Sequence, residues 1–137
     1  MIQYIRDKYK IKVIETPKNQ PAICDGIMIK NNDLIGIFES KCRYNINYND
    51  IKKMGSWLVT YKKIDECAWL SSKLRVPFYG ILYLKSDPTI LRWKITDNTG
   101  SYLFDFEVKQ TRTQRSINGG KAVRENAFLP TKYAMVI

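Results

Sequence analysis

Asp25 and Glu39 are the residues whose types and spacing could do chemistry together, with Lys41 two positions beyond Glu39. Two carboxylates that meet across neighbouring strands can hold a hard divalent cation such as Mg²⁺. A lysine on the same face could orient an attacking water or stabilise charge on a phosphate. The chain contains no histidine, which excludes histidine-based acid, base or nucleophile chemistry. The sequence therefore favours metal-assisted hydrolysis as the chemistry of these residues.

A β-hairpin is needed to bring the two acids together. Residues 23–30 and 34–41 are rich in β-branched side chains, and the Asn-Asn-Asp between them suits a tight turn. We predict a three-residue turn, so that Lys30 faces Leu34 and Asp25 faces Glu39. A two-residue turn would shift the register by one and break the match of isoleucines across the strands. One face then carries the acids and Lys41 together with Ile23, Ile27, Ile29, Ile35 and Ile37.

Composition narrows the class of protein and its partners. The 137 residues suit a single domain, and 23 Lys and Arg against 13 Asp and Glu give a net charge of +10. Such a charge favours a polyanionic partner, with nucleic acid first and an anionic membrane second. No apolar run is as long as a membrane span and the N-terminus is charged, so we expect no membrane partner and a cytoplasmic location. The three cysteines form no CxxC pair, which makes a zinc site improbable and favours small, reduced, partly buried residues.

The rest of the chain predicts a mixed α/β (α+β) domain. We expect a short helix over residues 1–10, a strand over 11–15 and a turn between Pro17 and Pro21. An apolar stripe at helical spacing predicts one long helix over residues 51–75 that covers a central sheet. Further strands are expected at 78–85, 90–96 and 102–108, the last two as a hairpin. A polar, basic loop follows, and the apolar C-terminus is expected to pack back on the body.

Asp25, thirteen residues, and then Glu39-Ser40-Lys41 resemble the metal-binding signature of the PD-(D/E)XK nuclease superfamily. With Arg43, the Glu-x-Lys-x-Arg pattern is similar to that of small bacterial and phage nucleases and of Holliday junction resolvase-like proteins. The resemblance covers residues 1–97, where an N-terminal helix, a meandering sheet and a long helix follow the superfamily order. It implies a restriction-endonuclease-like central mixed sheet flanked by helices, with residues 98–137 as a C-terminal β extension that includes the basic loop.

The resemblance also implies roles for individual residues. Asp25, Glu39 and the main-chain carbonyl of Ser40 would hold Mg²⁺, for which Mn²⁺ could substitute, and Lys41 would complete the catalytic set. Superfamily members often add a carboxylate from the N-terminal helix, for which the chain offers Asp7 or, on the next strand, Glu15. They also often carry a Gln or Lys on the helix after the signature, for which Lys53 is the candidate. The proline that often precedes the Asp is replaced here by a cysteine at position 24.

Two groups of basic residues are candidates for contacts to DNA. The first lies on the predicted long helix, where a solvated face is as good an interpretation as a DNA contact. The second lies in the C-terminal loop, where arginine alternates with threonine, glutamine and glycine, a mix that suits phosphate contacts. The first group comprises Lys52, Lys53, Lys62 and Lys63, and the second comprises Arg112, Arg115, Lys121 and Arg124.

Three functions remain open from the sequence. The first is a Mg²⁺-dependent DNA endonuclease that works as a homodimer in a bacterial or phage-infected cell, with branched or junction DNA as one candidate substrate. The second is a nucleic-acid-binding module that keeps the same fold without catalysis. The third is a ribonuclease, although the chain shows no RNA-recognition motif.

Overall fold

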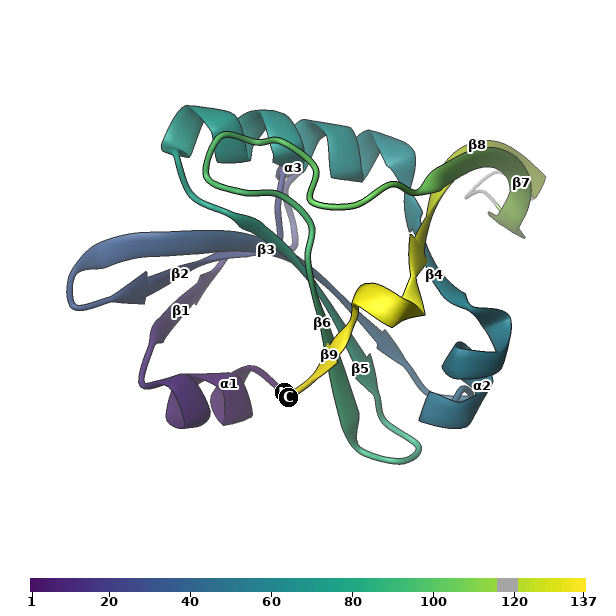
Figure 1. The fold of residues 1–137 in the computed structure, drawn as a ribbon, viewed down its shortest axis with the longest axis horizontal. Coiled ribbons are helices and arrows are strands. Elements are labelled where there is room, and N and C mark those ends of the chain that lie inside the picture. The colour runs from purple at the N-terminus through teal and green to yellow at the C-terminus, as the bar shows by residue number, and fades with distance from the viewer. Residues whose placement is uncertain (116–120) are drawn as a thin grey trace.

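The computed structural model describes residues 1–115 and 121–137, and the side chains of residues 1–111 and 124–137. Its centre is a six-stranded mixed sheet with the strand order β1-β2-β3-β5-β6-β9, and a three-stranded sheet of order β4-β8-β7 stands beside it (Figure 1). Only β3 and β5 of the large sheet run parallel to each other. In chain order the elements are α1 (Ile2–Tyr9), β1 (Lys12–Glu15), β2 (Gly26–Lys30), β3 (Asp33–Arg43), α2 (Tyr48–Met54), β4 (Ser56–Thr60), α3 (Tyr61–Leu74), β5 (Phe78–Leu84), β6 (Thr89–Lys94), β7 (Glu107–Arg115), β8 (Lys121–Pro130), a 3-10 turn (Thr131–Tyr133) and β9 (Met135–Val136).

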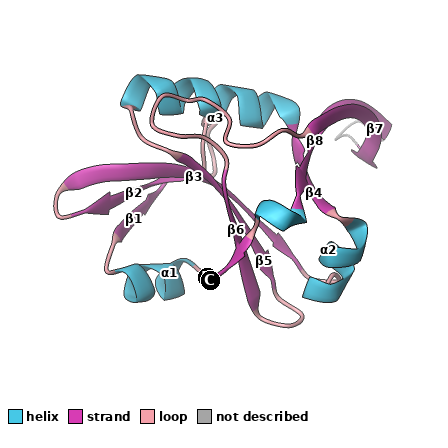
Figure 2. Ribbon diagram, in the orientation of Figure 1, coloured by secondary structure: helices cyan, strands magenta, loops and turns pink. Residues whose placement is uncertain are grey.

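The fold is therefore a mixed α+β arrangement, as predicted at this coarse level (Figure 2). The N-terminal helix, the strand after it and the strand over Phe78–Leu84 are confirmed. The C-terminus does pack back on the body, because β9 adds to the edge of the large sheet beside β6. Within the described residues, the structure holds no helix with the length and apolar character needed to cross a bilayer.

The β2–β3 hairpin has the predicted register near the acids but not near its turn. Gly26 pairs with Phe38 and Ile27 with Ile37, as expected, whereas Lys30 pairs with Asp33. The turn therefore has two residues, Asn31 and Asn32, whose positive φ angles of 52° and 66° are typical of two-residue hairpin turns. The register then shifts between Met28 and Ile29, and this irregularity cancels the offset that the shorter turn introduces.

The same shift corrects the predicted isoleucine face. Ile35 packs with Met28 and Phe38 on the side of the sheet that α1 covers, whereas Leu34 packs with Ile37 on the other side. An extra residue in one strand reverses the alternation of side chains beyond it. The predicted face is therefore continuous from the acids to Ile37 and ends there.

The predicted long helix over residues 51–75 is wrong. Helix α2 ends at Gly55, which has a φ of 80°, a left-handed conformation that glycine adopts without steric cost. Strand β4 follows at once, with Trp57 and Val59 buried on one side, and it pairs with β8. Of the predicted helix only the part from Tyr61 onward is helical and covers the large sheet, as α3.

The predicted hairpin between residues 90–96 and 102–108 is also wrong. A single bridge between Thr96 and Tyr102 joins these segments, and β6 takes β9 as its second partner instead. The expected polar loop is largely the β7–β8 hairpin, whose strand β8 completes the smaller sheet.

Two apolar clusters occupy the two faces of the large sheet. On one face α3 and the smaller sheet bury Ile37, Ile64, Leu82 and Trp93. On the opposite face α1 covers Phe38, Ile81 and Ile90, to which Ile5 contributes from the helix. Figure 1 shows α3 and α1 on opposite sides of the strands. Neighbouring residues of β3 therefore point into different environments, Phe38 toward α1 and Glu39 toward α3.

Candidate functional site

Asp25 is fixed beside β3 by backbone and side-chain hydrogen bonds. Its N–H donates to the carbonyl of Phe38 at 2.9 Å, one residue out of step with the Gly26–Phe38 pair, so the strand is irregular at Asp25. Its carbonyl accepts from the N–H of Thr16 at 2.8 Å. Its Oδ2 accepts from the N–H of Ser40 at 2.8 Å and lies 3.5 Å from the Ser40 Oγ. The main chain of β3 therefore positions this carboxylate, and Thr16 holds the backbone of Asp25 from the other side.

Glu39 is a buried acid with an unpartnered oxygen. Its side chain lies on the α3 side of β3, the residue is 2% exposed, and Oε2 has no hydrogen-bond partner. Burial, followed by the negative charge of Asp25, raises the pKa of Glu39 to about 7, although Lys63 and Lys41 oppose the shift. A buried acid beside a second acid is costly when ionised, unless a cation lies between them.

A divalent cation fits this donor set. Two carboxylates, one with a free buried oxygen, are hard ligands of the kind that Mg²⁺ takes from proteins while it keeps other positions for water and phosphate. The N–H and carbonyl of one strand residue point to the same edge, so the carbonyl of Ser40 faces the side on which Asp25 lies. Among the side chains that the structure describes, no three Cys, Asp or Glu residues converge as a metal site. A metal would therefore rest on Asp25, Glu39 and the main chain.

The acids lie in an open cleft of about 1090 Å³ between three walls. The first wall is the segment between β1 and β2, the second is the junction of β4 with α3, and the third is the described part of β8. Cations come from all three walls and from β3, namely Lys18, Lys41, Lys62, Lys63 and Arg124. Acids other than Asp25 and Glu39 lie at Glu15, Asp65, Glu66 and Glu125. The cleft is large enough for several units of a polymer and carries both charges.

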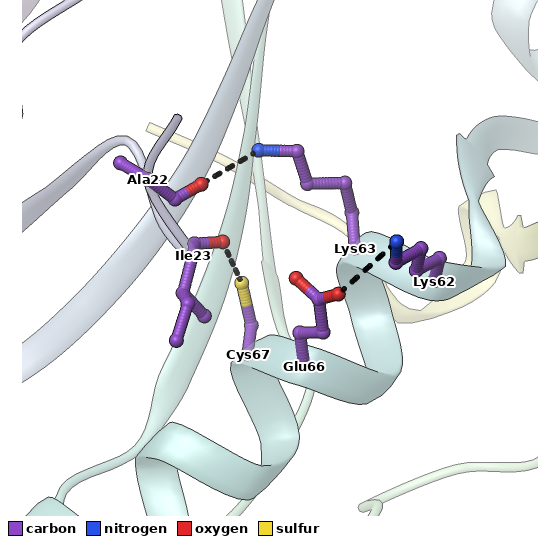
Figure 3. Close-up of polar contacts among 6 residues, drawn as sticks. All are labelled: Ala22, Ile23, Lys62, Lys63, Glu66 and Cys67. Atoms are coloured by element: carbon purple, nitrogen blue, oxygen red, sulfur yellow. Dashed lines mark hydrogen bonds and ion pairs between the residues drawn. The ribbon is translucent and has the colours of Figure 1, made fainter. Parts of the chain in front are cut away.

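Lys63 ties the first wall to α3 (Figure 3). Its Nζ donates to the carbonyl of Ala22 at 3.1 Å, and the Sγ of Cys67 one helical turn later donates to the carbonyl of Ile23 at 3.2 Å. Lys62 instead points away and forms a weak, exposed pair with Glu66 at 3.8 Å. These two contacts hold the segment before Asp25 against the helix, with the ammonium of Lys63 near Glu39.

The cysteines near the site are structural. All three cysteines of the chain are free, and Cys24 and Cys67 are buried. Burial raises the pKa of both thiols, and the nearby acids raise them further, so both stay protonated at neutral pH. A protonated buried thiol is a poor metal ligand and a poor nucleophile.

The structure separates the remaining sequence candidates. Glu15 lies on the wall of the cleft. Asp7 lies on α1 outside the cleft, where its carboxylate accepts a hydrogen bond from the side chain of Gln3. Lys52 and Lys53 lie on α2 and do not line the cleft, because Gly55 ends that helix before it reaches the site. Arg124 does line it. The side chains of Arg112, Arg115 and Lys121 lie outside the described residues, although their backbones belong to β7 and β8.

Sequence reasoning missed part of the cleft. Lys18 and Gln20 line it from a segment that the two flanking prolines marked only as a turn. Asp65 and Glu66 could have been predicted from the sequence, because on a helix they lie within one turn of Lys62 and Lys63. Glu125 comes from β8, whose pairing with β4 no local pattern indicates, whereas its neighbour Arg124 was among the predicted contacts.

No protein-family model, curated protein or solved structure matches this chain at a significant level.

Proposed function

We propose that the chain is a Mg²⁺-dependent endonuclease that hydrolyses phosphodiester bonds of DNA, with Mn²⁺ as a substitute metal. The observation that carries the proposal is the buried, unpartnered carboxylate oxygen of Glu39 beside Asp25, in a cleft that also presents Lys41 and Lys63. An uncompensated buried acid pair lowers stability, so its presence in a cleft points to a ligand of opposite charge.

The order of elements supports a PD-(D/E)XK-like interpretation of the site. Helix α1 precedes the antiparallel strands β1, β2 and β3, and α3 leads into β5, which lies parallel to β3. Asp25 comes directly before β2, and Glu39 and Lys41 both lie on β3. The restriction-endonuclease-like assignment rests on this order together with the spacing of the three residues.

Each residue of the site has a distinct role in this proposal. Asp25 and Glu39 would hold the metal, which when bound supplies positive charge next to the phosphate and makes water a better nucleophile at neutral pH. Asp25 is held for this role by the N–H of Ser40. Lys41 is exposed and lies two residues beyond Glu39, so its Nζ can donate to the attacking water or to a phosphate oxygen.

DNA is the substrate that the charges favour. The net charge of +10 suits a phosphate backbone, whereas the cleft itself has five cations and six acids and would favour that backbone only with a divalent cation bound. Two copies of the chain would supply two such sites for two strands, which sedimentation of the purified protein with and without DNA can test.

Cleavage assays test the proposal directly. Purified protein is incubated with plasmid, single-stranded DNA, branched DNA and RNA, in Mg²⁺, Mn²⁺ or EDTA. We expect metal-dependent DNA cleavage that Glu39→Ala and Lys41→Ala abolish and that Asp33→Asn, at the far end of the same hairpin, retains. If wild type cuts nothing but binds DNA, the chain is a binding module, and if it cuts only RNA, the substrate assignment is wrong.

A further inference from the structure

A second cavity lies on the opposite face of the large sheet, under α1. Its volume is about 140 Å³, close to that of an engineered protein cavity of about 150 Å³ that binds benzene. Apart from two cations, every residue that lines it is Ile, Met or Tyr. Ile5, Met28, Ile35 and Ile81 belong to the apolar lining, and the two cations are Lys30 and Arg92.

Arg92 is the unusual member of this cavity. It enters from β6, and its guanidinium carbon lies 5.3 Å from the centre of the Tyr79 ring. One amino group approaches the sulfur of Met135 at 3.5 Å, a weak acceptor, and the buried Nε has no hydrogen-bond partner. Within the described side chains, neither Arg92 nor Lys30 forms an ion pair. A half-buried guanidinium with a free donor and no acid lacks the partner that such groups normally have.

We propose that this cavity binds a small carboxylate whose apolar body is about the size of one ring. A carboxylate matches the planar fork of an arginine through two parallel hydrogen bonds. A phosphate is larger and more strongly hydrated, which suits this apolar lining less well. The hollow has room for about one ring-sized apolar group. The Ile and Met side chains would cover the ring, and Arg92 and Lys30 would neutralise the charge.

The position of the cavity makes it independent of the cleft. The large sheet separates the two, since Phe38 points toward the cavity side and Glu39 toward the cleft. The proposal therefore does not rest on the nuclease assignment. It can fail or succeed whether or not the chain cuts DNA.

Methyl NMR of isoleucine tests the proposal with benzoate as the probe. The uncharged control is benzyl alcohol and the oppositely charged control is benzylamine. We expect benzoate to shift the methyl resonances of Ile5, Ile35 and Ile81 while those of Ile51 and Ile64, in the other core, stay in place. Benzoate should bind about tenfold more tightly than benzyl alcohol, since a hydrogen bond to a charged group adds that much or more.

Variants separate the charge from the cavity. Arg92→Met should weaken benzoate about tenfold or more and leave benzyl alcohol within about twofold. Arg92→Lys, which keeps the charge without the fork, should fall between wild type and Arg92→Met. Lys94→Met, on the same strand but outside the cavity, is the matched control. Equal binding of benzoate and benzyl alcohol, or no response of the cavity methyl groups, would overturn the proposal. So would concentration-dependent shifts without any ligand, because a second copy of the chain would then occupy the cavity.

Discussion

Each face of the large sheet carries an ionisable side chain with one buried atom that has no hydrogen-bond partner. On the α3 face it is Oε2 of Glu39, and on the α1 face it is Nε of Arg92. The surroundings of the two groups differ in kind. Glu39 lies beside a second acid in a cleft of about 1090 Å³, whereas Arg92 lies on an aromatic ring in a cavity of about 140 Å³.

The comparison shows that the surroundings of a charged group decide which ligand would stabilise it. An acid next to an acid gains most from a divalent cation, and an open cleft with lysines on its walls leaves room for a polyanion as well. A guanidinium among isoleucines gains most from one small anion with an apolar body. The two faces of one sheet therefore point to two ligands of opposite charge.

Asp25→Asn should have the largest effect on the cleft face. Loss of one of the two carboxylates should lower the rate of DNA cleavage by about 10²-fold or more, as removal of a charge-stabilising group does in other enzymes. Initial rates on plasmid DNA in Mg²⁺ measure the effect. Asp7→Asn is the matched control on the α1 face and should stay within about twofold of wild type. An equal loss in Asp7→Asn would mean that α1 supplies a ligand and that the two faces are not independent.

Gly26→Ala and Gly80→Ala compare the packing of the two faces. A Cβ at Gly26 would lie 2.5 Å from Cζ of Phe38 and 2.7 Å from the backbone oxygen of Ile14, whereas a Cβ at Gly80 would lie 3.0 Å from the Trp57 ring. We expect the first change to lower the free energy of unfolding by about 2–3 kcal/mol and the second by about 1 kcal/mol. Urea unfolding at one pH measures both. A larger loss for Gly80→Ala would show that the α1 face is the looser of the two.

Stability without metal should depend on pH through Glu39. Its pKa is about 7 in the folded protein and 4.5 in an unperturbed glutamate, so the folded state binds more protons between these values. The free energy of unfolding should therefore fall as the pH rises from about 4.5 to about 7 and then level off. Glu39→Gln should raise the melting temperature at pH 8 by roughly 3–6 °C and leave it nearly unchanged at pH 4.

Thermal unfolding in the presence of Mg²⁺ tests whether Glu39 holds the metal. The metal should stabilise wild type at pH 8 much more than at pH 5, where Glu39 is protonated, and should not stabilise Glu39→Gln. Thermal unfolding followed by circular dichroism, with and without Mg²⁺, gives all of these values. Equal stabilisation of wild type and Glu39→Gln by Mg²⁺ would place the metal elsewhere.

Lys63→Met should produce the smallest change and the most specific one. Lys63 lowers the pKa of Glu39, so its removal should raise that pKa and shift the onset of Mg²⁺ stabilisation to higher pH. At a pH high enough to ionise Glu39 in both proteins, the variant should bind Mg²⁺ roughly two- to fivefold more tightly than wild type. The reason is that a part-exposed positive charge no longer opposes the metal. Calorimetric titration should show weaker Mg²⁺ binding than wild type at pH 6.5 and tighter binding at pH 8.5. Lys62→Met is the matched control on the exposed side of α3.

The hairpin could be predicted from the sequence because the residues that determine its register lie close together in the chain. The isoleucines and the acids fix which residues share a face near Asp25 and Glu39, and only one register satisfies them. The turn could not be predicted to the residue, since a two-residue turn with a later irregularity gives the same register as a three-residue turn. Ile35 is the one residue of the expected face for which that difference matters.

The second sheet could not be predicted because the strands that pair in it lie far apart in the sequence. Residues 56–60 fit a helical stripe and an alternating strand equally well, and only their pairing with β8 decides between the two. The partner residues lie more than sixty positions further along the chain. The same distance hid the third wall of the cleft, since Arg124 reaches the site only through that pairing.

The β4–β8 pairing also has a consequence for the order in which the molecule can assemble. Ser56 pairs with Pro130, so β4 has no strand partner until residues 126–130 have been made. At ribosomal rates of about 5–20 residues per second, the interval is about 4–15 s. During that time Trp57 and Val59 lack their cover, although Asp25, Glu39 and Lys41 have already been synthesised. The acid pair therefore exists before the cleft that encloses it, and the cleft gains its third wall only after β8 has been synthesised.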